Sequence, residues 1–217
     1  MKYKNTYHAK FISRPNRFEA LVDIEGKTEL VHVKNTGRMK ELLFPGAEVI
    51  LEKSENTQRK TAYDMICVYK VALGLINIDS QAPNKVVYEW LKKADYDYIK
   101  PEYSYGNSRF DFYMEKGSDR YLLEVKGCTL ETDGIGYFPD APTQRGVKHL
   151  YELCEASRNG FKCAVAFVIQ MPGIREVRAN VVTHAAFGDA LEYAKSMGVE
   201  VLMLECDITE NSIKIIS

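Results

Sequence analysis

Residues 108–126 restrict the fold of this chain more than any other segment, because they predict a β-hairpin with one apolar and one charged face. Apolar side chains alternate with charged or polar ones on both sides of a turn centred on Gly117, as expected of two paired strands. In the first strand, Phe110, Phe112 and Met114 are predicted to share the apolar face. The opposite face carries charges that a buried strand normally lacks.

Two carboxylates are predicted to face each other in this hairpin, because the turn pairs Asp111 with Glu124. Opposed cross-strand residues have Cβ atoms about 5 Å apart, so two carboxylates there repel each other unless a cation lies between them or one is protonated. Lys126 follows on the same face. Two acids and a lysine suit a divalent cation, Mg²⁺ or Mn²⁺, beside an activated water. The alternative is a solvated strand face with an ordinary charge pair, for which Glu-x-Lys is also typical.

The composition excludes several classes of protein. A chain of 217 residues forms one large domain or two small ones, and its net charge of -1 argues against coating nucleic acid by bulk charge but allows a local basic cleft. The five cysteines are scattered without a Cys-x-x-Cys pair, which predicts free, buried thiols and a cytoplasmic location. No signal-peptide pattern and no apolar run of membrane-spanning length is present, so we expect no membrane association.

Residues 1–80 are predicted to form a small, closed β-barrel of the OB type, for which a small β-sandwich is the alternative. The predicted strands are residues 18–24, 28–33, 47–52 and a long, bent strand over 61–73. OB barrels bind nucleic acid through charged loops. The basic residues in the predicted loops and strand ends are together candidates for such a face, although each one alone is more typical of a solubilising charge: Arg14, Arg17, Arg38, Lys40, Arg59 and Lys60.

Residues 81–217 are predicted to form an α/β domain with a mixed sheet. A helix begins at residues 80–83, and Glu89 lies beside its apolar stripe, either facing a metal cleft or on the surface. Residues 95–105 are predicted to be a connector, and residues 127–142 a loop that borders the cleft. The strands and helix that complete the domain are predicted at residues 163–169, 183–197, 199–206 and 212–216, the first of them a parallel strand.

A helix that follows this loop is predicted to bind an anion. Thr143 caps it, and Gln144, Arg145 and Lys148 lie in its first turn and a half, where free amides and cations favour phosphate. A solvated basic face is the alternative. The predicted buried stripe of this helix is Val147, Leu150, Tyr151 and Cys154. The histidines have no spacing that suggests a metal site, and the sequence assigns no role to His8, His32, His149 or His184.

The order of helix, hairpin with Asp and Glu-x-Lys, basic helix and parallel strand resembles the PD-(D/E)xK nuclease core. More specifically, the chain resembles the sugar fermentation stimulation protein A family. The stretches that carry this resemblance are NTGRMKELLFPG (35–46), INIDSQAPN (76–84), YGNSRFDF (105–112), YLLEVKGCTL (121–130) and YFPDAPTQRGVKHL (137–150). They are spread over both halves of the chain.

The resemblance implies an OB-like domain over residues 1–80, a nuclease-like domain over residues 81–217, DNA binding and a role in sugar utilisation. It also implies that Asp111 and Glu124 bind the metal, that Lys126 is catalytic and that Glu89 is an optional further acid. Arg145 and Lys148 would lie on the helix after the catalytic strand. Asp111 follows Phe110 instead of proline, so the motif name does not apply literally.

Three functions are consistent with these residues. The first is a DNA-binding enzyme in which Asp111, Glu124 and the Val125 carbonyl hold Mg²⁺ for phosphodiester hydrolysis, with Lys126 beside the attacking water. The second is a regulatory DNA-binding protein that uses the same scaffold without cleavage. The third is a metabolic or protein-interaction domain with no nucleic-acid partner, which the near-neutral charge allows.

Overall fold

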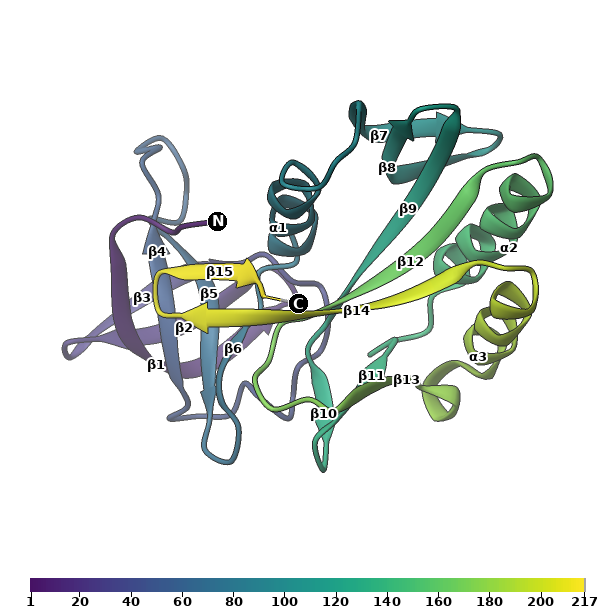
Figure 1. Cartoon of the computed structure of the whole chain (residues 1–217). Coiled ribbons are helices and arrows are strands. Elements are labelled where there is room, and N and C mark those ends of the chain that lie inside the picture. The colour runs from purple at the N-terminus through teal and green to yellow at the C-terminus, as the bar shows by residue number, and fades with distance from the viewer. Residues whose placement is uncertain (217) are drawn as a thin grey trace.

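A small β-barrel forms the N-terminal part of the chain in the computed structural model, which describes residues 1–216 (Figure 1). Its sheet has the order β3-β2-β1-β4-β5-β6, and an additional parallel pairing of β3 with β5 closes the first five strands into a barrel. The strands are β1 (Thr6–Asn16), β2 (Glu19–Ile24), β3 (Lys27–Val33), β4 (Glu48–Lys53), β5 (Tyr63–Lys70) and β6 (Gly74–Asn77). This strand order is that of an OB-fold, so the predicted barrel is confirmed.

Two details of the barrel differ from the prediction. The sequence does not predict β1, because Ala9 and Phe11 are the buried residues of this strand and its other positions are mainly polar or exposed. The predicted long strand over residues 61–73 is wrong: it ends at Lys70, and a turn leads into β6 at Gly74. Gly74 has a φ of +102°, a conformation that other residues rarely adopt and that allows the chain to reverse there.

A six-stranded mixed sheet forms the second part of the chain, in the order β15-β14-β12-β9-β8-β7. Its strands are β7 (Tyr98–Tyr105), β8 (Ser108–Lys116), β9 (Asp119–Cys128), β12 (Lys162–Ile169), β14 (Glu200–Thr209) and β15 (Ser212–Ile215). β12 pairs in parallel with both β9 and β14, and the two ends of the sheet are antiparallel. The predicted α/β domain with a mixed sheet is therefore confirmed.

Helices cover the two faces of this sheet unequally (Figure 1). The short helix α1 (Ala82–Leu91) packs on one face with Leu123 and Val125, whereas α2 (Gln144–Arg158) and α3 (Val181–Ser196) pack on the other with Leu122 and Val165. Thr143 caps α2 as predicted, since its side chain accepts a hydrogen bond from the Gly146 amide. The unequal cover leaves part of the α1 face open.

Two segments that were predicted to lack regular structure contain strands. The connector over residues 95–105 includes β7, which forms the edge of the sheet beside β8. The loop over residues 127–142 contains the hairpin β10 (Leu130–Thr132) and β11 (Ile135–Phe138), and β11 pairs in parallel with β13 (Glu176–Ala179). β7 is mostly exposed, and β10 and β11 are short, so these strands bury few side chains and leave a weak pattern in the sequence.

The two ends of the chain lie side by side. Lys2 forms an antiparallel bridge with Ser212, and the N-terminal amine donates a 2.6 Å hydrogen bond to the Ile213 carbonyl. In Figure 1 the strands β14 and β15 extend from the second sheet across the barrel. Among residues 1–216, no helix has both the length and the apolar character that crossing a membrane requires. The cysteines are free and buried, as predicted.

Candidate functional site

The hairpin brings Asp111 close enough to Glu124 for the two charges to interact. β8 and β9 pair from Lys116 with Asp119 to Phe112 with Leu123, which is the predicted register. The next residue, Asp111, accepts a 2.7 Å hydrogen bond from the Val125 amide through Oδ2.

The apolar alternation of β8 breaks at this point, which corrects one prediction. Phe112 and Met114 pack on the α1 side of the sheet, but Phe110 packs on the α2 side. The carboxylate of Asp111 binds the amide of β9 and also accepts a 2.6 Å hydrogen bond from the Asn84 side chain on α1. The strand therefore leaves its regular alternation where the candidate site begins.

Glu124 is the most buried charged residue of the site, with 3% of its surface exposed. Its Oε1 accepts a 2.5 Å hydrogen bond from Nδ1 of His149 and contacts the Lys126 ammonium. Its Oε2 is buried and has no hydrogen-bond partner within residues 1–216. A buried carboxylate oxygen without a partner is costly, and a bound cation or hydrogen-bond donor would remove this cost.

The two carboxylates differ in how readily they ionise. Burial and then the charge of Glu124 raise the pKa of Asp111, and the Val125 amide, Asn84 and Lys126 offset this only in part. Burial also acts to raise the pKa of Glu124, but the hydrogen bond from His149 and the charge of Lys126 outweigh it, so the net shift is downward. At neutral pH the site thus holds an ionised glutamate next to an aspartate whose charge is unfavourable, and a cation bound to both would relieve the repulsion.

His149 belongs to the site although the sequence gives it no role. It is 3% exposed, and its Nε2 accepts a 3.3 Å hydrogen bond from Nε of Arg145, so a neutral imidazole with its proton on Nδ1 satisfies both neighbours. The signal in the sequence is the spacing of Arg145 and His149, which lie one turn apart on α2. The predicted buried stripe of α2 includes Tyr151, but Tyr151 is exposed and the stripe contains His149 and Leu153 instead.

Glu89 does not join the other two acids, so its predicted role as a metal ligand is not supported. Its carboxylate forms a 2.7 Å ion pair with the N-terminal amine of Met1. Within residues 1–216, no three acidic, histidine or cysteine side chains gather as a metal-binding group. The residue of α1 that reaches the site is Asn84, which lies in the first turn of the helix.

Of the predicted anion-binding residues on α2, only Arg145 contacts the site. Gln144 lies 3.4 Å from Nε2 of His184, and Lys148 donates a 2.8 Å hydrogen bond to the Asn107 carbonyl. Lys148 also lies 3.6 Å from the carboxylate of Glu152. These contacts hold the start of α2 against its neighbours, so Arg145, which reaches Glu124 through His149, is the one predicted cation of α2 that takes part in the site.

The predicted basic face of the barrel divides into two parts. One part is a hollow of about 660 Å³ whose lining includes Arg14, Arg17, Arg38 and Lys40, together with Ala141 from the second domain. We call it the basic pocket.

Two of the predicted basic residues lie elsewhere, paired with acids. Arg59 forms a 2.6 Å ion pair with Asp64, and Lys60 forms a 2.8 Å ion pair with Glu19. Their charges are therefore largely neutralised, and the predicted nucleic-acid face is reduced to the basic pocket.

Arg14 has a structural role within the basic pocket. Its guanidinium group donates hydrogen bonds to backbone carbonyls of Arg17 and of the 35–38 loop, at 2.6 to 3.1 Å. It therefore fixes the loop that carries Arg38. Arg17, Arg38 and Lys40 form no ion pair among residues 1–216 and remain the free cations of this pocket.

The loops of the two domains meet between the basic pocket and the end of β9. A small crevice there is lined by Asn35 and Ser80 from the first domain and by Gly127 and Asp140 from the second. A Cβ atom on Gly37 would collide with the Asp140 carboxylate, so the two loops are in close contact at this point. Gly127 directly follows Lys126 in β9, so the strand that carries Glu124 and Lys126 leads into this crevice.

Comparison with known proteins identifies relatives over nearly the whole chain. A family model described as the SfsA N-terminal OB domain matches residues 12–78, and one described as the sugar fermentation stimulation protein RE domain matches residues 81–212. A sugar fermentation stimulation protein homolog of Desulfitobacterium hafniense is 52% identical over 217 residues, covering 99% of this chain and 95% of the relative. A homolog of Clostridium beijerinckii is 52% identical over 219 residues, covering 99% and 96%.

A solved structure shows the same fold. It is described as SfsA of Pyrococcus furiosus in complex with Ca²⁺. It has a TM-score of 0.86 with this chain at 24% sequence identity, and the match covers 99% of this chain and 95% of that one.

Proposed function

This chain belongs to the sugar fermentation stimulation protein family, and from that premise we propose that it binds DNA and hydrolyses phosphodiester bonds at a divalent-metal site. Asp111, Glu124 and Lys126 form the reacting site. The basic pocket of the barrel supplies contacts to the DNA backbone. The two parts are linked through the interdomain loops that lie between them.

The Oε2 atom of Glu124 is the observation that carries this proposal. This oxygen is buried and has no hydrogen bond among residues 1–216. The negative charge of the same carboxylate also disfavours ionisation of Asp111. Together with the Val125 carbonyl, these two carboxylates are the oxygen ligands that Mg²⁺ and Mn²⁺ prefer. The Pyrococcus furiosus relative is described as a complex with Ca²⁺, another cation that binds oxygen ligands. When bound here, the cation supplies a Lewis acid and a water of lowered pKa.

Residues around the carboxylates hold them in position for this chemistry. Asn84 and the Val125 amide fix Asp111 through hydrogen bonds of 2.6 and 2.7 Å. His149 fixes Glu124 at 2.5 Å. Carboxylate ligands held by such neighbours need little rearrangement when a cation binds, which favours binding.

Lys126 and Arg145 provide positive charge for the phosphate. Lys126 is mostly buried and contacts Glu124, so its ammonium group lies where a phosphate oxygen next to the carboxylates would accept a hydrogen bond. It stabilises the negative charge that develops on that oxygen during hydrolysis. Arg145 uses Nε to contact His149, which leaves its terminal nitrogens available for a second phosphate contact.

DNA binding depends on local charge in this chain, because its net charge is only -1. The free cations of the basic pocket are Arg17, Arg38 and Lys40, and a pocket of about 660 Å³ accommodates a phosphate with its sugar. Phosphate contacts make affinity depend steeply on salt concentration. DNA affinity that falls with salt and with the loss of these charges would support the proposal.

Cleavage assays test the proposed activity. Wild type and Lys126→Ala are incubated with single-stranded and double-stranded DNA in Mg²⁺ or Mn²⁺, and products are resolved on gels. We expect cleavage to depend on the metal and to fall by at least about 100-fold in Lys126→Ala. Lys148→Ala is the matched control, because it removes a lysine that contacts Asn107 instead of the carboxylates. Equal cleavage by wild type and Lys126→Ala would contradict the assignment.

A DNA-binding protein that does not cleave is the second candidate. It is favoured by the small number of acidic ligands, since no third acid joins Asp111 and Glu124 among residues 1–216. Gel-shift experiments distinguish the two. A protein that only binds shifts DNA in EDTA and leaves it intact after incubation with Mg²⁺ or Mn²⁺.

A further inference from the structure

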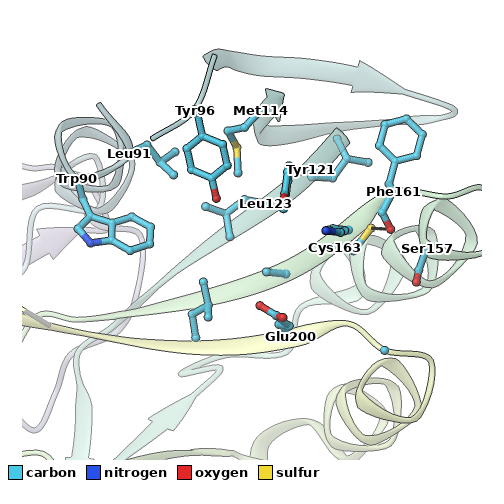
Figure 2. A pocket seen from close by; sticks show the side chains of 15 residues that line it. Trp90, Leu91, Tyr96, Met114, Tyr121, Leu123, Ser157, Phe161, Cys163 and Glu200 are labelled. Atoms are coloured by element: carbon cyan, nitrogen blue, oxygen red, sulfur yellow. Dashed lines mark hydrogen bonds between the residues drawn. The ribbon is translucent and has the colours of Figure 1, made fainter. Parts of the chain in front are cut away.

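A pocket of about 360 Å³ opens on the α1 face of the six-stranded sheet, and we call it the aromatic pocket (Figure 2). It lies where α1 ends and leaves the sheet uncovered, between the β8–β9 hairpin and the first residues of β12 and β14. Asp111, Glu124 and Lys126 are not among its lining residues. Its volume falls in the range of small-molecule sites.

Four aromatic residues line this pocket, Phe161 and three whose rings form the aromatic wall. Trp90 comes from α1, Tyr96 from the segment after it, and Tyr121 from β9; Figure 2 shows them around Leu123. The rings of Tyr96 and Tyr121 meet edge to face, with centroids 5.4 Å apart and an interplanar angle of 76°. Leu123 and Leu202 of the sheet form an apolar floor.

The charge that remains unpaired at the aromatic pocket is negative. Lys162 forms a 2.5 Å ion pair with Asp119 at the rim. Glu200, at the start of β14, also lines the pocket and has no ion-pair partner among residues 1–216. Glu200 lies close enough to the aromatic wall to act on Tyr96: burial, Tyr121 and then the Glu200 charge raise the pKa of that phenol.

We propose that the aromatic pocket binds a small organic cation, whose charged nitrogen meets Glu200 while its apolar part lies against Trp90, Tyr96 and Tyr121. The negative faces of aromatic rings attract cations, and cages of such rings are a recurrent site for quaternary ammonium groups. An anion is less well served here, because the basic residue that lines the pocket, Lys162, is bound to Asp119, and Arg120 lies over the ring of Phe161. A metal ion would find a single carboxylate, whereas Mg²⁺ and Ca²⁺ take six or more oxygen ligands.

Trp90 provides a direct assay, because it is the single tryptophan of the chain. The full chain is titrated with choline and with benzyltrimethylammonium, and tryptophan emission is followed. The neutral control is 3,3-dimethylbutan-1-ol, which has the shape of choline without its charge. We expect choline to saturate the signal with about tenfold higher affinity than the neutral alcohol, as a cation–π contact and an ion pair provide.

Two glutamine variants separate a site effect from a general charge effect. Glu200→Gln keeps the shape of the side chain, and we expect it to weaken choline binding about tenfold without changing the affinity for the neutral alcohol. Glu205→Gln removes the same charge from β14, but Glu205 borders a different pocket, so choline binding stays as in wild type. Tyr96→Leu removes one wall and lowers the affinity for both cations.

Three results would overturn the proposal. The first is the absence of saturable binding of either cation, measured both by tryptophan emission and by saturation-transfer NMR. The second is equal affinity for choline and the neutral alcohol, which would make the pocket a purely apolar one. The third is equal weakening by Glu200→Gln and Glu205→Gln, which would reduce the effect to net charge.

Discussion

His149→Phe tests whether the histidine on α2 holds Glu124 in its ionised, oriented form. The phenylalanine ring retains the packing on Phe110, whose ring centroid lies 5.8 Å from that of His149. The substitution removes the Nδ1–H that Glu124 accepts at 2.5 Å. Glu124, which is 3% exposed, then keeps Lys126 as its one hydrogen-bond donor among residues 1–216.

The expected cost follows from the charge and the burial of Glu124. A hydrogen bond to a charged group contributes about 1.5–3 kcal/mol, and the loss is larger where the charge stays buried. We therefore expect His149→Phe to lower the free energy of unfolding by about 2–3 kcal/mol. For a chain of 217 residues this corresponds to a fall in Tm of roughly 4–12 °C. Urea unfolding in EDTA measures the change without a contribution from bound metal.

A double-mutant cycle with Glu124→Gln separates the pair from its surroundings. If His149 acts through Glu124, the combined loss in the double variant is smaller than the sum of the two single losses, by about 1 kcal/mol or more. Additive losses would refute the reasoning, because the two side chains would then contribute independently.

Metal affinity gives a second and independent readout of the same contact. Loss of a neighbour that orients a metal ligand typically costs tenfold to about 100-fold in affinity, so we expect this weakening for Mn²⁺ in calorimetry on His149→Phe. His184→Phe is the control, because His184 contacts the first turn of α2 at Thr143 and not Glu124. Unchanged Mn²⁺ affinity in His149→Phe would show that the histidine has only a packing role.

Three further predictions follow from the charges. Burial and Glu124 raise the pKa of Asp111, so ionisation of Asp111 destabilises the fold as pH rises. We therefore expect Asp111→Asn to be more stable than wild type by about 1 kcal/mol at pH 7 in EDTA. Urea unfolding should show this gain shrinking towards about pH 4. Burial acts to raise the pKa of Asp64, but Arg59, His32 and Lys34 outweigh it and lower this pKa to about 2. Asp64→Asn should therefore lower the free energy of unfolding by about 2 kcal/mol at pH 7. Thermal unfolding should show this loss disappearing as pH falls from about 4 to 2. Arg38→Gln should lower DNA affinity and reduce the slope of log affinity against log salt by about 1 in fluorescence anisotropy, whereas its Tm stays within about 2 °C of wild type.

The hairpin was predictable because its information is local. The turn at Gly117, with a φ of +57°, and the pattern of apolar residues around it set the register that brings Asp111 next to Glu124. The barrel was predictable for a similar reason, since several of its strands are short, apolar and separated by clear turns. β1 and β7 were not, because edge or mainly exposed strands bury too few side chains to leave a pattern.

The residues that complete the site depend on how helices are placed against the sheet, which a single sequence does not specify. Glu89 and Asn84 lie on the same helix, and only its position relative to β8 decides that Asn84 reaches Asp111. Arg14 was expected to face nucleic acid, but its neighbours are backbone carbonyls of a loop, which have no signature in the side-chain pattern.

The break in the alternation of β8 and the construction of the site have a common origin. Asp111 binds the Val125 amide through its side chain, and the paired residues of the hairpin end at Phe112. With the regular alternation interrupted, Phe110 packs on the α2 side, where its ring meets His149. His149 in turn donates to Glu124. The contact of Phe110 with His149 and the hydrogen bond from Asp111 to β9 thus depend on the same irregularity of β8.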